Sequence, residues 1–226
     1  SDLLTAERTG AFLKIIPLLE NGDLDLSALP DLINSKVKLV AVTHMSNSLG
    51  TINDVSRIIE QAHAFDIPVL IDGAQSIAHM PIDVQKLDCD FFVFSGHKIY
   101  GPTGIGALYA KENHLLNMEP YQGGGDMILN VSFEKTEYND IPYKFEAGTP
   151  NIEGTIGMAA ALKYVSELGI EAIDEYEQEL LAYAAKQFSQ IEGLKIIGTA
   201  PKKGSIISFV LDGIHPHDVG TIMDME

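Results

Sequence analysis

The chain has 226 residues, of which 46% are hydrophobic and 21% charged, so it can bury one large core, or one core and a smaller lobe. Its formal net charge of −17 argues against nucleic acid and anionic membranes as partners, because phosphate-bearing surfaces are bound by clustered Lys and Arg. The sequence holds no signal-peptide pattern and no apolar run long enough to span a bilayer, and its single cysteine, Cys89, fits a reducing compartment; we therefore expect a cytoplasmic protein that acts on a small molecule.

In chain order, the first half alternates expected strands and helices. Val55, Ile58, Ile59 and Ala62 recur with helical spacing, which predicts an amphipathic helix over residues 54–66. The alternation is typical of an α/β fold with a mostly parallel sheet and helices on both faces. Apolar runs predict strands at 12–18, 37–42, 67–73, 90–95 and 105–110, and a short helix is expected at 26–34.

The second half has a different pattern. Residues 112–150 show no clear period and are expected to form long loops. Two helices are expected over 153–169 and 170–193, each closed by a glycine. We expect residues 1–155 to be part of a large domain, and residues 156–226 to supply long helices and the start of a small C-terminal α+β domain with strands at 194–198 and 205–211 and a helix after Pro216. The absence of an initiator Met and the abrupt last helix indicate a fragment lacking both ends.

The stretch SGHKIYGPTGIG, residues 95–106, places one lysine in a glycine-rich turn after an apolar run. Lys98 lacks the neighbours of a phosphate-binding P-loop, and the glycines do not follow the dinucleotide pattern. The histidines show no metal-ligand spacing, and no nucleophile elbow of a serine hydrolase occurs. These alternatives therefore lose their main support, and no metal is expected.

Polar groups follow several predicted strands at the end where the strands of a parallel sheet converge. Asp72 and Gln75 follow one strand, and Lys98 follows the next. An amine, a carboxylate and small polar donors are what pyridoxal phosphate requires, because the amine forms a Schiff base and the acid keeps the ring nitrogen protonated. Taken singly, Lys98 could be a surface turn lysine, and Asp72 and Thr149 could be helix caps.

Three blocks carry a specific resemblance: THMSNSLGTIN, the run from VLIDGAQ to SGHKIYGPTGIGALY, and FEAGTPNIEG. They closely resemble the cysteine desulfurase and selenocysteine lyase group of the class V aminotransferase-like family, over nearly the whole chain. The resemblance implies a PLP-dependent transferase type I fold and a homodimer with a shared active site. It also implies L-cysteine or L-selenocysteine as substrate, alanine as product, and a sulfur-acceptor protein in iron–sulfur cluster assembly.

The resemblance also implies a role for each matching residue. Lys98 is expected to bind the cofactor covalently and to move the substrate proton, and Asp72 to pair with the pyridinium nitrogen. The other expected cofactor contacts are Gln75 to the ring's phenolic oxygen, Ser95 and His97 to the phosphate, Thr149 to the phosphate from the partner subunit, and Asn47 beside the cofactor hydroxyl and the substrate carboxylate. Gly101, Gly104 and Gly106 are expected to shape the turn.

Two parts of the family's machinery find no match in this sequence. Cys89 does not match the family's sulfur-accepting cysteine motif and is interpreted as a half-buried structural thiol. The only arginines, Arg8 and Arg57, both precede Lys98, so a carboxylate-binding Arg is also missing. The alternatives are a kynureninase-like or epimerase-like enzyme of the same fold, or an inactive fragment that contributes a dimer surface.

Overall fold

The computed structural model describes residues 2–225, which divide into two compact units. Of the described residues, unit 1 comprises 2–40, 44–68 and 177–225, and unit 2 comprises 41–43 and 69–176. Each unit is described by itself below. Within the described residues, no helix is both long and apolar enough to cross a membrane.

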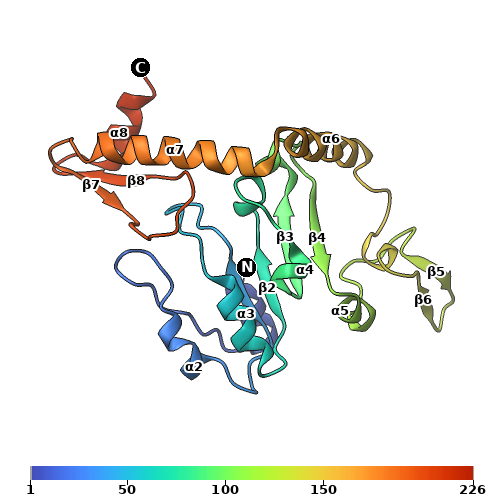
Figure 1. The fold of residues 1–226 in the computed structure, drawn as a ribbon. Helices are drawn as coiled ribbons and strands as arrows, with labels where there is room; N and C mark the ends of the chain where they lie inside the picture. Colours follow the sequence, from blue (N-terminus) through green and yellow to red (C-terminus); the bar gives the residue numbers. More distant parts are fainter. Residues whose placement is uncertain (1, 226) are drawn as a thin grey trace. The chain divides into compact units, whose positions relative to one another are not determined.

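Unit 2 is built on a four-stranded sheet with the order β1-β2-β3-β4 (Figure 1). Strands β2 and β3 are parallel, with Asp72 opposite Val93, whereas β3 and β4 are antiparallel, with Ser95 opposite Gly106. The strands are β1 (Val40–Thr43), β2 (Val69–Asp72), β3 (Phe91–Ser95) and β4 (Gly106–Ala110).

Short helices follow two of these strands, and one long helix packs against the short helices. The 3-10 helix η2 (Ser76–Ala78) follows β2, and η3 (Gly96–Ile99) follows β3. A buried cluster of Ala78, Ile99 and Val165 joins η2, η3 and helix α6 (Ile152–Leu168). This packing fixes the turns that carry the predicted site residues.

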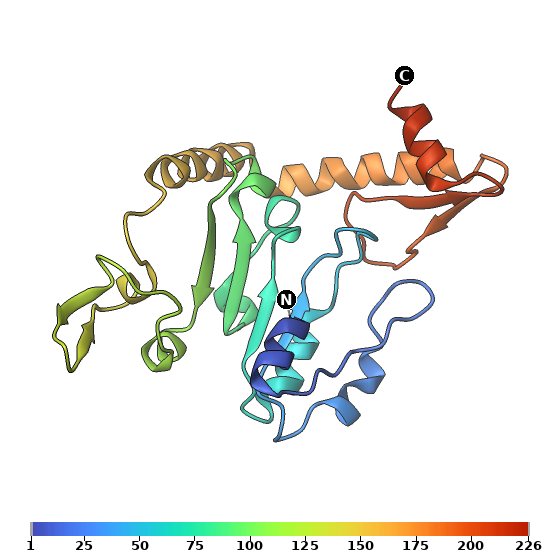
Figure 2. The same ribbon diagram turned by 180° about the vertical axis from the view of Figure 1, so that it is seen from behind.

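The middle of the chain is more ordered than expected. Residues 112–150 were predicted to be long loops, but they contain α5 (Glu112–Asn117), the antiparallel hairpin β5 (Ile128–Val131) and β6 (Thr136–Tyr138), and η4 (Tyr143–Phe145). Figure 2 shows this hairpin, in yellow-green, apart from the four-stranded sheet of the same unit. The residues of β5 and β6 are mostly exposed, so neither strand needs the alternation of apolar and polar residues by which a strand is recognised in a sequence.

Unit 1 contains the predicted amphipathic helix α3 (Val55–His63), and its four apolar positions, Val55, Ile58, Ile59 and Ala62, are all buried. Asp54 caps this helix by accepting a hydrogen bond from the Arg57 N–H. Helix α2 (Leu29–Leu32) packs against it. The other elements of unit 1 are α1 (Asp2–Thr9), η1 (Leu26–Ala28), β7 (Leu194–Ile197), β8 (Ser208–Leu211) and α8 (Pro216–Met223). Helix α7 (Ile170–Phe188) begins in unit 2 and continues into unit 1, and α4 (Val84–Leu87) belongs to unit 2.

One predicted strand is wrong. Residues 12–18 form no strand, and the only pairing there is an isolated bridge between Leu18 and Leu24 across a tight turn. Phe12 is 97% exposed, so in the part of the chain that the structure describes this apolar run meets no sheet edge to pair with. By contrast, the two expected C-terminal strands are confirmed as the antiparallel pair β7 and β8.

Candidate active site

Asp72 and Gln75 stand where β2 ends. Asp72 is the last residue of the strand, and its Oδ1 accepts a hydrogen bond from the Ala74 N–H at 2.9 Å, which turns the chain immediately. Gly73 is buried between them, and a Cβ there would overlap the Phe92 ring. Glycine is therefore required at this position for the carboxylate and the amide to leave the sheet within one turn.

Ser95, His97 and Lys98 occupy the equivalent place after β3. Ser95 ends the strand, and His97 and Lys98 lie in η3, with the Lys98 side chain half-buried and that of His97 exposed. The Gly96 N–H donates to Ile105 O at 2.8 Å, and the Gly101 N–H donates to Gly96 O at 2.9 Å. The turn is therefore closed on both sides of the lysine.

The glycines of this turn serve its geometry, as expected. Gly104 has a positive φ of 75°, and a Cβ on Gly101 would lie 2.8 Å from Gly96 O. A Cβ on Gly106 would lie 2.6 Å from Phe94 O. Side chains at Gly101 and Gly106 would push the backbone of β3, η3 and β4 apart, whereas Gly104 is favoured by its positive φ.

The two strand ends present one set of donors. Because β2 and β3 are adjacent and parallel, their carboxyl ends lie at the same edge of the sheet, and η2 contacts η3 there. The set consists of one carboxylate, one amide, one hydroxyl, one imidazole and one amine, from Asp72, Gln75, Ser95, His97 and Lys98. This set fits pyridoxal phosphate, which requires an amine, an acid for the ring nitrogen and neutral or cationic donors for the phosphate.

The other two predicted cofactor residues are placed differently. Thr149 belongs to unit 2, but it is exposed and lies in the loop before α6. Asn47 is exposed and belongs to unit 1, in the loop after β1. The structure therefore gathers five of the seven predicted residues at neighbouring strand ends, and the roles of all seven stay predictions.

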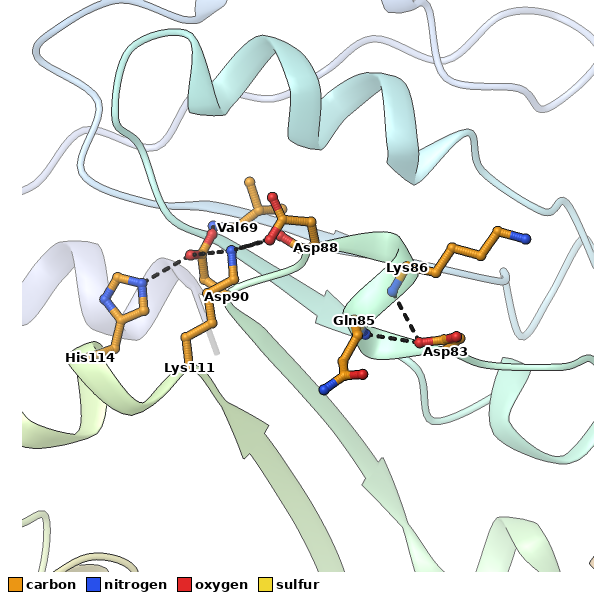
Figure 3. Close-up of polar contacts among 8 residues, drawn as sticks. All are labelled: Val69, Asp83, Gln85, Lys86, Asp88, Asp90, Lys111 and His114. Atoms are coloured by element: carbon orange, nitrogen blue, oxygen red, sulfur yellow. Dashed lines mark hydrogen bonds and ion pairs between the residues drawn. The ribbon is translucent and has the colours of Figure 1, made fainter.

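A second polar cluster, which sequence reasoning missed, lies at the opposite end of β3 (Figure 3). Asp90 is buried, and its Oδ2 accepts a hydrogen bond from the Val69 N–H at 2.8 Å. Its Oδ1 lies 2.9 Å from His114 Nε2 and 3.4 Å from Lys111 Nζ. The Lys111 ammonium also pairs with Asp88 at 2.6 Å. The isolated sequence positions carried no motif, and only the fold brings them together.

Cys89 lies beside this cluster and is fully buried, so its interpretation as a structural thiol holds and its burial is greater than expected. Burial raises the pKa of the Cys89 thiol, and the neighbouring Asp90 carboxylate raises it further. A protonated, inaccessible thiol is a poor nucleophile. In the described residues, moreover, no group of three or more His, Cys, Asp or Glu side chains is arranged to hold a metal ion.

The fold and the donor set define a class of protein, the pyridoxal-phosphate-dependent enzymes. Residues 3–226 match the family model described as aminotransferase class-V. The chain is 49% identical over 223 residues to a probable cysteine desulfurase from Xylella fastidiosa (strain 9a5c), covering 99% of this chain and 54% of that protein. It is 51% identical over 218 residues to a cysteine desulfurase from Escherichia coli (strain SE11), covering 96% and 53% respectively.

The solved structures agree with the sequence relatives. The crystal structure of the cysteine desulfurase CsdA from Escherichia coli superposes with a TM-score of 0.93 at 38% identity, covering 99% of this chain and 55% of that chain. The chain belongs to the class-V aminotransferase family. The expected α/β fold of this family is confirmed, with a mixed central sheet. The chain spans about half the length of the curated relatives it matches.

Proposed function

We propose that the protein of which this chain is a part is a pyridoxal-phosphate-dependent cysteine desulfurase, which takes L-cysteine or L-selenocysteine, releases alanine and passes sulfur or selenium on. The observation that carries the proposal is the donor set at the ends of β2 and β3, in a chain about 50% identical to proteins named cysteine desulfurase. This support favours the desulfurase over a kynureninase-like or epimerase-like enzyme. An inert fragment is an alternative that experiment decides.

Each residue at the strand ends has a task in this proposal. Lys98 Nζ would hold the cofactor and move the proton at the Cα of the substrate. Asp72 would keep the ring nitrogen protonated, and Gln75 would donate to the ring's phenolic oxygen. Ser95 and His97 would hold the phosphate. When bound, pyridoxal phosphate supplies an electron sink for the negative charge left at Cα.

The homodimer belongs to the same proposal. Several large apolar side chains of residues 121–133 are exposed in unit 2, and Phe133 and Tyr121 are the most exposed of them. The Gly148 N–H donates to Gly125 O at 2.8 Å, so the loop carrying Thr149 is attached to this exposed region. Exposed apolar patches of this kind mark interfaces, which supports a second copy on this face and Thr149 serving the partner's cofactor. The proposal has four further parts: a sulfur-acceptor protein as partner, a role in iron–sulfur cluster assembly, a cytoplasmic location, and a domain boundary near residue 155.

The test uses the whole protein purified with pyridoxal phosphate. With a thiol reductant such as dithiothreitol present to reduce the transferred sulfur, the unsubstituted enzyme is expected to show the visible absorbance of lysine-bound cofactor and to release alanine and sulfide from L-cysteine. Lys98→Ala is expected to lose both signals, whereas Lys86→Ala, an exposed lysine on α4, keeps them.

Two results would count against parts of this proposal. Bound cofactor without alanine or sulfide release rejects the desulfurase and favours another reaction on the same fold. Lysine-bound cofactor absorbance that survives in Lys98→Ala rejects the assignment of that lysine.

A further inference from the structure

The loop that carries Asn47, residues 46–52, is held by a segment far away in the sequence. This segment, residues 198–208, precedes and enters β8, and both parts lie in unit 1. Two backbone hydrogen bonds join them, from the Gly204 N–H to Gly50 O at 2.8 Å and from the Ile52 N–H to Lys202 O at 3.0 Å. The Ser208 side chain adds a third, because its Oγ donates to Ser48 O.

Lys203 adds a charged cross-link to this contact. Its Nζ donates to Leu49 O and also to Gly198 O at 2.8 Å. The side chain is half-buried, and burial lowers the pKa of its ammonium. A partly desolvated ammonium is tolerated when acceptors replace its water, and the two carbonyl oxygens do so here. Lys203 therefore joins the Asn47 loop to the turn that begins at Gly198.

The two segments fit too closely for the loop to shift toward residues 198–208. Gly198 has a positive φ of 77°, and a Cβ there would lie 2.9 Å from Leu49 Cβ. A Cβ on Gly204 would lie 2.7 Å from Met45 Sδ. The Asn47 side chain itself is exposed.

The loop is also braced internally. The Leu49 N–H donates to Ser46 Oγ at 3.1 Å, and the Gly50 N–H donates to Ser46 O at 3.0 Å. Asn47 thus sits on an internally bonded turn of unit 1, and its own side chain is exposed. This is how a rigid loop presents a polar group to a ligand.

We propose that Lys203 is a positioning residue, which fixes the Asn47 amide by holding the carbonyl of Leu49, two residues further along the same turn. This inference rests on the proposed function, in which Asn47 lies beside the cofactor hydroxyl and the substrate carboxylate. It adds to that function a cation that does not touch the substrate and yet sets how well the substrate carboxylate is bound.

The experiment compares Lys203→Met with Lys202→Met in the whole protein loaded with pyridoxal phosphate. Lys202 is the adjacent, exposed lysine, so its substitution removes the same charge and leaves the Leu49 carbonyl bonded. Lys203→Met is expected to speed hydrogen exchange of the amides of residues 46–52 and to raise KM for L-cysteine about tenfold. The cofactor absorbance and kcat are expected to change much less, and Lys203→Arg, which keeps the charge and the donors, is expected to restore KM.

A double-mutant cycle with Asn47→Ala shows whether Lys203 acts through Asn47. If it does, Lys203→Met raises KM in the unsubstituted background and adds little once Asn47 is alanine. Additive effects, or unchanged exchange in residues 46–52, overturn the inference. If Lys203→Met does not fold, the cycle and the exchange measurement are made with Lys203→Gln, which keeps N–H donors without the charge.

Failure of the proposed function gives a different result. In that case the unsubstituted protein releases neither alanine nor sulfide from L-cysteine, and the exchange comparison alone decides whether Lys203 holds the loop. An Asn47→Ala variant with unchanged KM in an active desulfurase overturns the inference while the proposed reaction stands.

Discussion

His44, three residues before Asn47, is unusually buried for a loop residue. It is 5% exposed, and among the described residues its buried Nδ1 finds no hydrogen-bond partner. Burial lowers the pKa of the imidazole from 6.5 to about 4, because the cation has nothing there to replace its water. The folded state therefore keeps His44 neutral at pH values where the unfolded chain protonates it.

The stability of the folded chain should consequently depend on pH through His44. Above pH 6.5 the His44 imidazole is neutral in both the folded and the unfolded state, so it does not lower the free energy of unfolding. Between pH 6.5 and about 4 the imidazole is protonated in the unfolded state but not in the folded state, so the free energy of unfolding falls as the pH falls. The full loss amounts to about 3 kcal/mol. Denaturant unfolding from pH 7 to pH 4 should show that the curve of His44→Gln is flatter than that of the unsubstituted chain. Parallel curves would mean that the imidazole titrates normally in the fold.

At the scale of single elements, Asp90 links three of them. Its carboxylate binds the first N–H of β2, stands directly before β3 and meets His114 on α5 (Figure 3). Removing the carboxylate would leave the fully buried Val69 N–H without its acceptor. It would also remove the bond to His114 that helps to hold α5 beside the sheet. The cluster lies at the end of β3 opposite to Lys98, so it supports the site without belonging to it.

Asp90→Ala is therefore expected to lower the free energy of unfolding by about 3 kcal/mol, since a buried, multiply bonded carboxylate is lost. Asp88→Asn is the matched control, because the Asp88 side chain is 65% exposed and its pair with Lys111 faces solvent. Exposed pairs contribute about 0–1 kcal/mol. Circular dichroism in a denaturant series measures both variants, and equal losses would contradict the role given to Asp90.

The elements also show how far a sequence pattern reaches. Helix α3 could be predicted because one of its faces is buried. A buried helical face requires apolar residues at helical spacing, and the sequence has them at Val55, Ile58, Ile59 and Ala62. The run at 12–18 has the same apolar character, but a strand needs a partner edge that no local pattern encodes. The hairpin β5–β6 was missed for the complementary reason, since its exposed faces require no alternation.

The candidate site and its surroundings likewise contain residues whose positions the sequence predicts and residues whose contacts it does not. The placement of Asp72 and Lys98 at one edge could be predicted, because Asp72 ends one apolar strand and Lys98 lies in the turn after the next, and β2 and β3 pair in parallel. The contacts of Lys203 could not be predicted, because its two acceptors are backbone carbonyls. Every residue has a backbone carbonyl, so the sequence does not indicate which of them a lysine will bind. Asp90 and His114 likewise meet only through the fold.

At the scale of the whole molecule, we propose that the site is shared between two copies of this chain. The chain spans about half of its curated relatives, and its described units present large exposed apolar side chains. Thr149 is exposed, and its loop is attached to the region that includes Tyr121 and Phe133. Such an arrangement suits a two-fold dimer in which each copy lends Thr149 to the cofactor of the other, because a symmetric interface makes the exchange reciprocal.

Mixing two inactive variants of the whole protein tests that exchange. Under the proposed function, Lys98→Ala dimers would lack the catalytic amine, and Thr149→Ala dimers would bind pyridoxal phosphate weakly through loss of a phosphate donor. If Thr149 serves the partner, random reassociation makes half of the dimers mixed, and each mixed dimer holds one site with both residues intact. Desulfurase activity at limiting cofactor should then recover to about a quarter of the unsubstituted value. Thr149 acting within its own chain would instead leave every site of the mixture with one defect, and activity would stay at the sum of the separate variants.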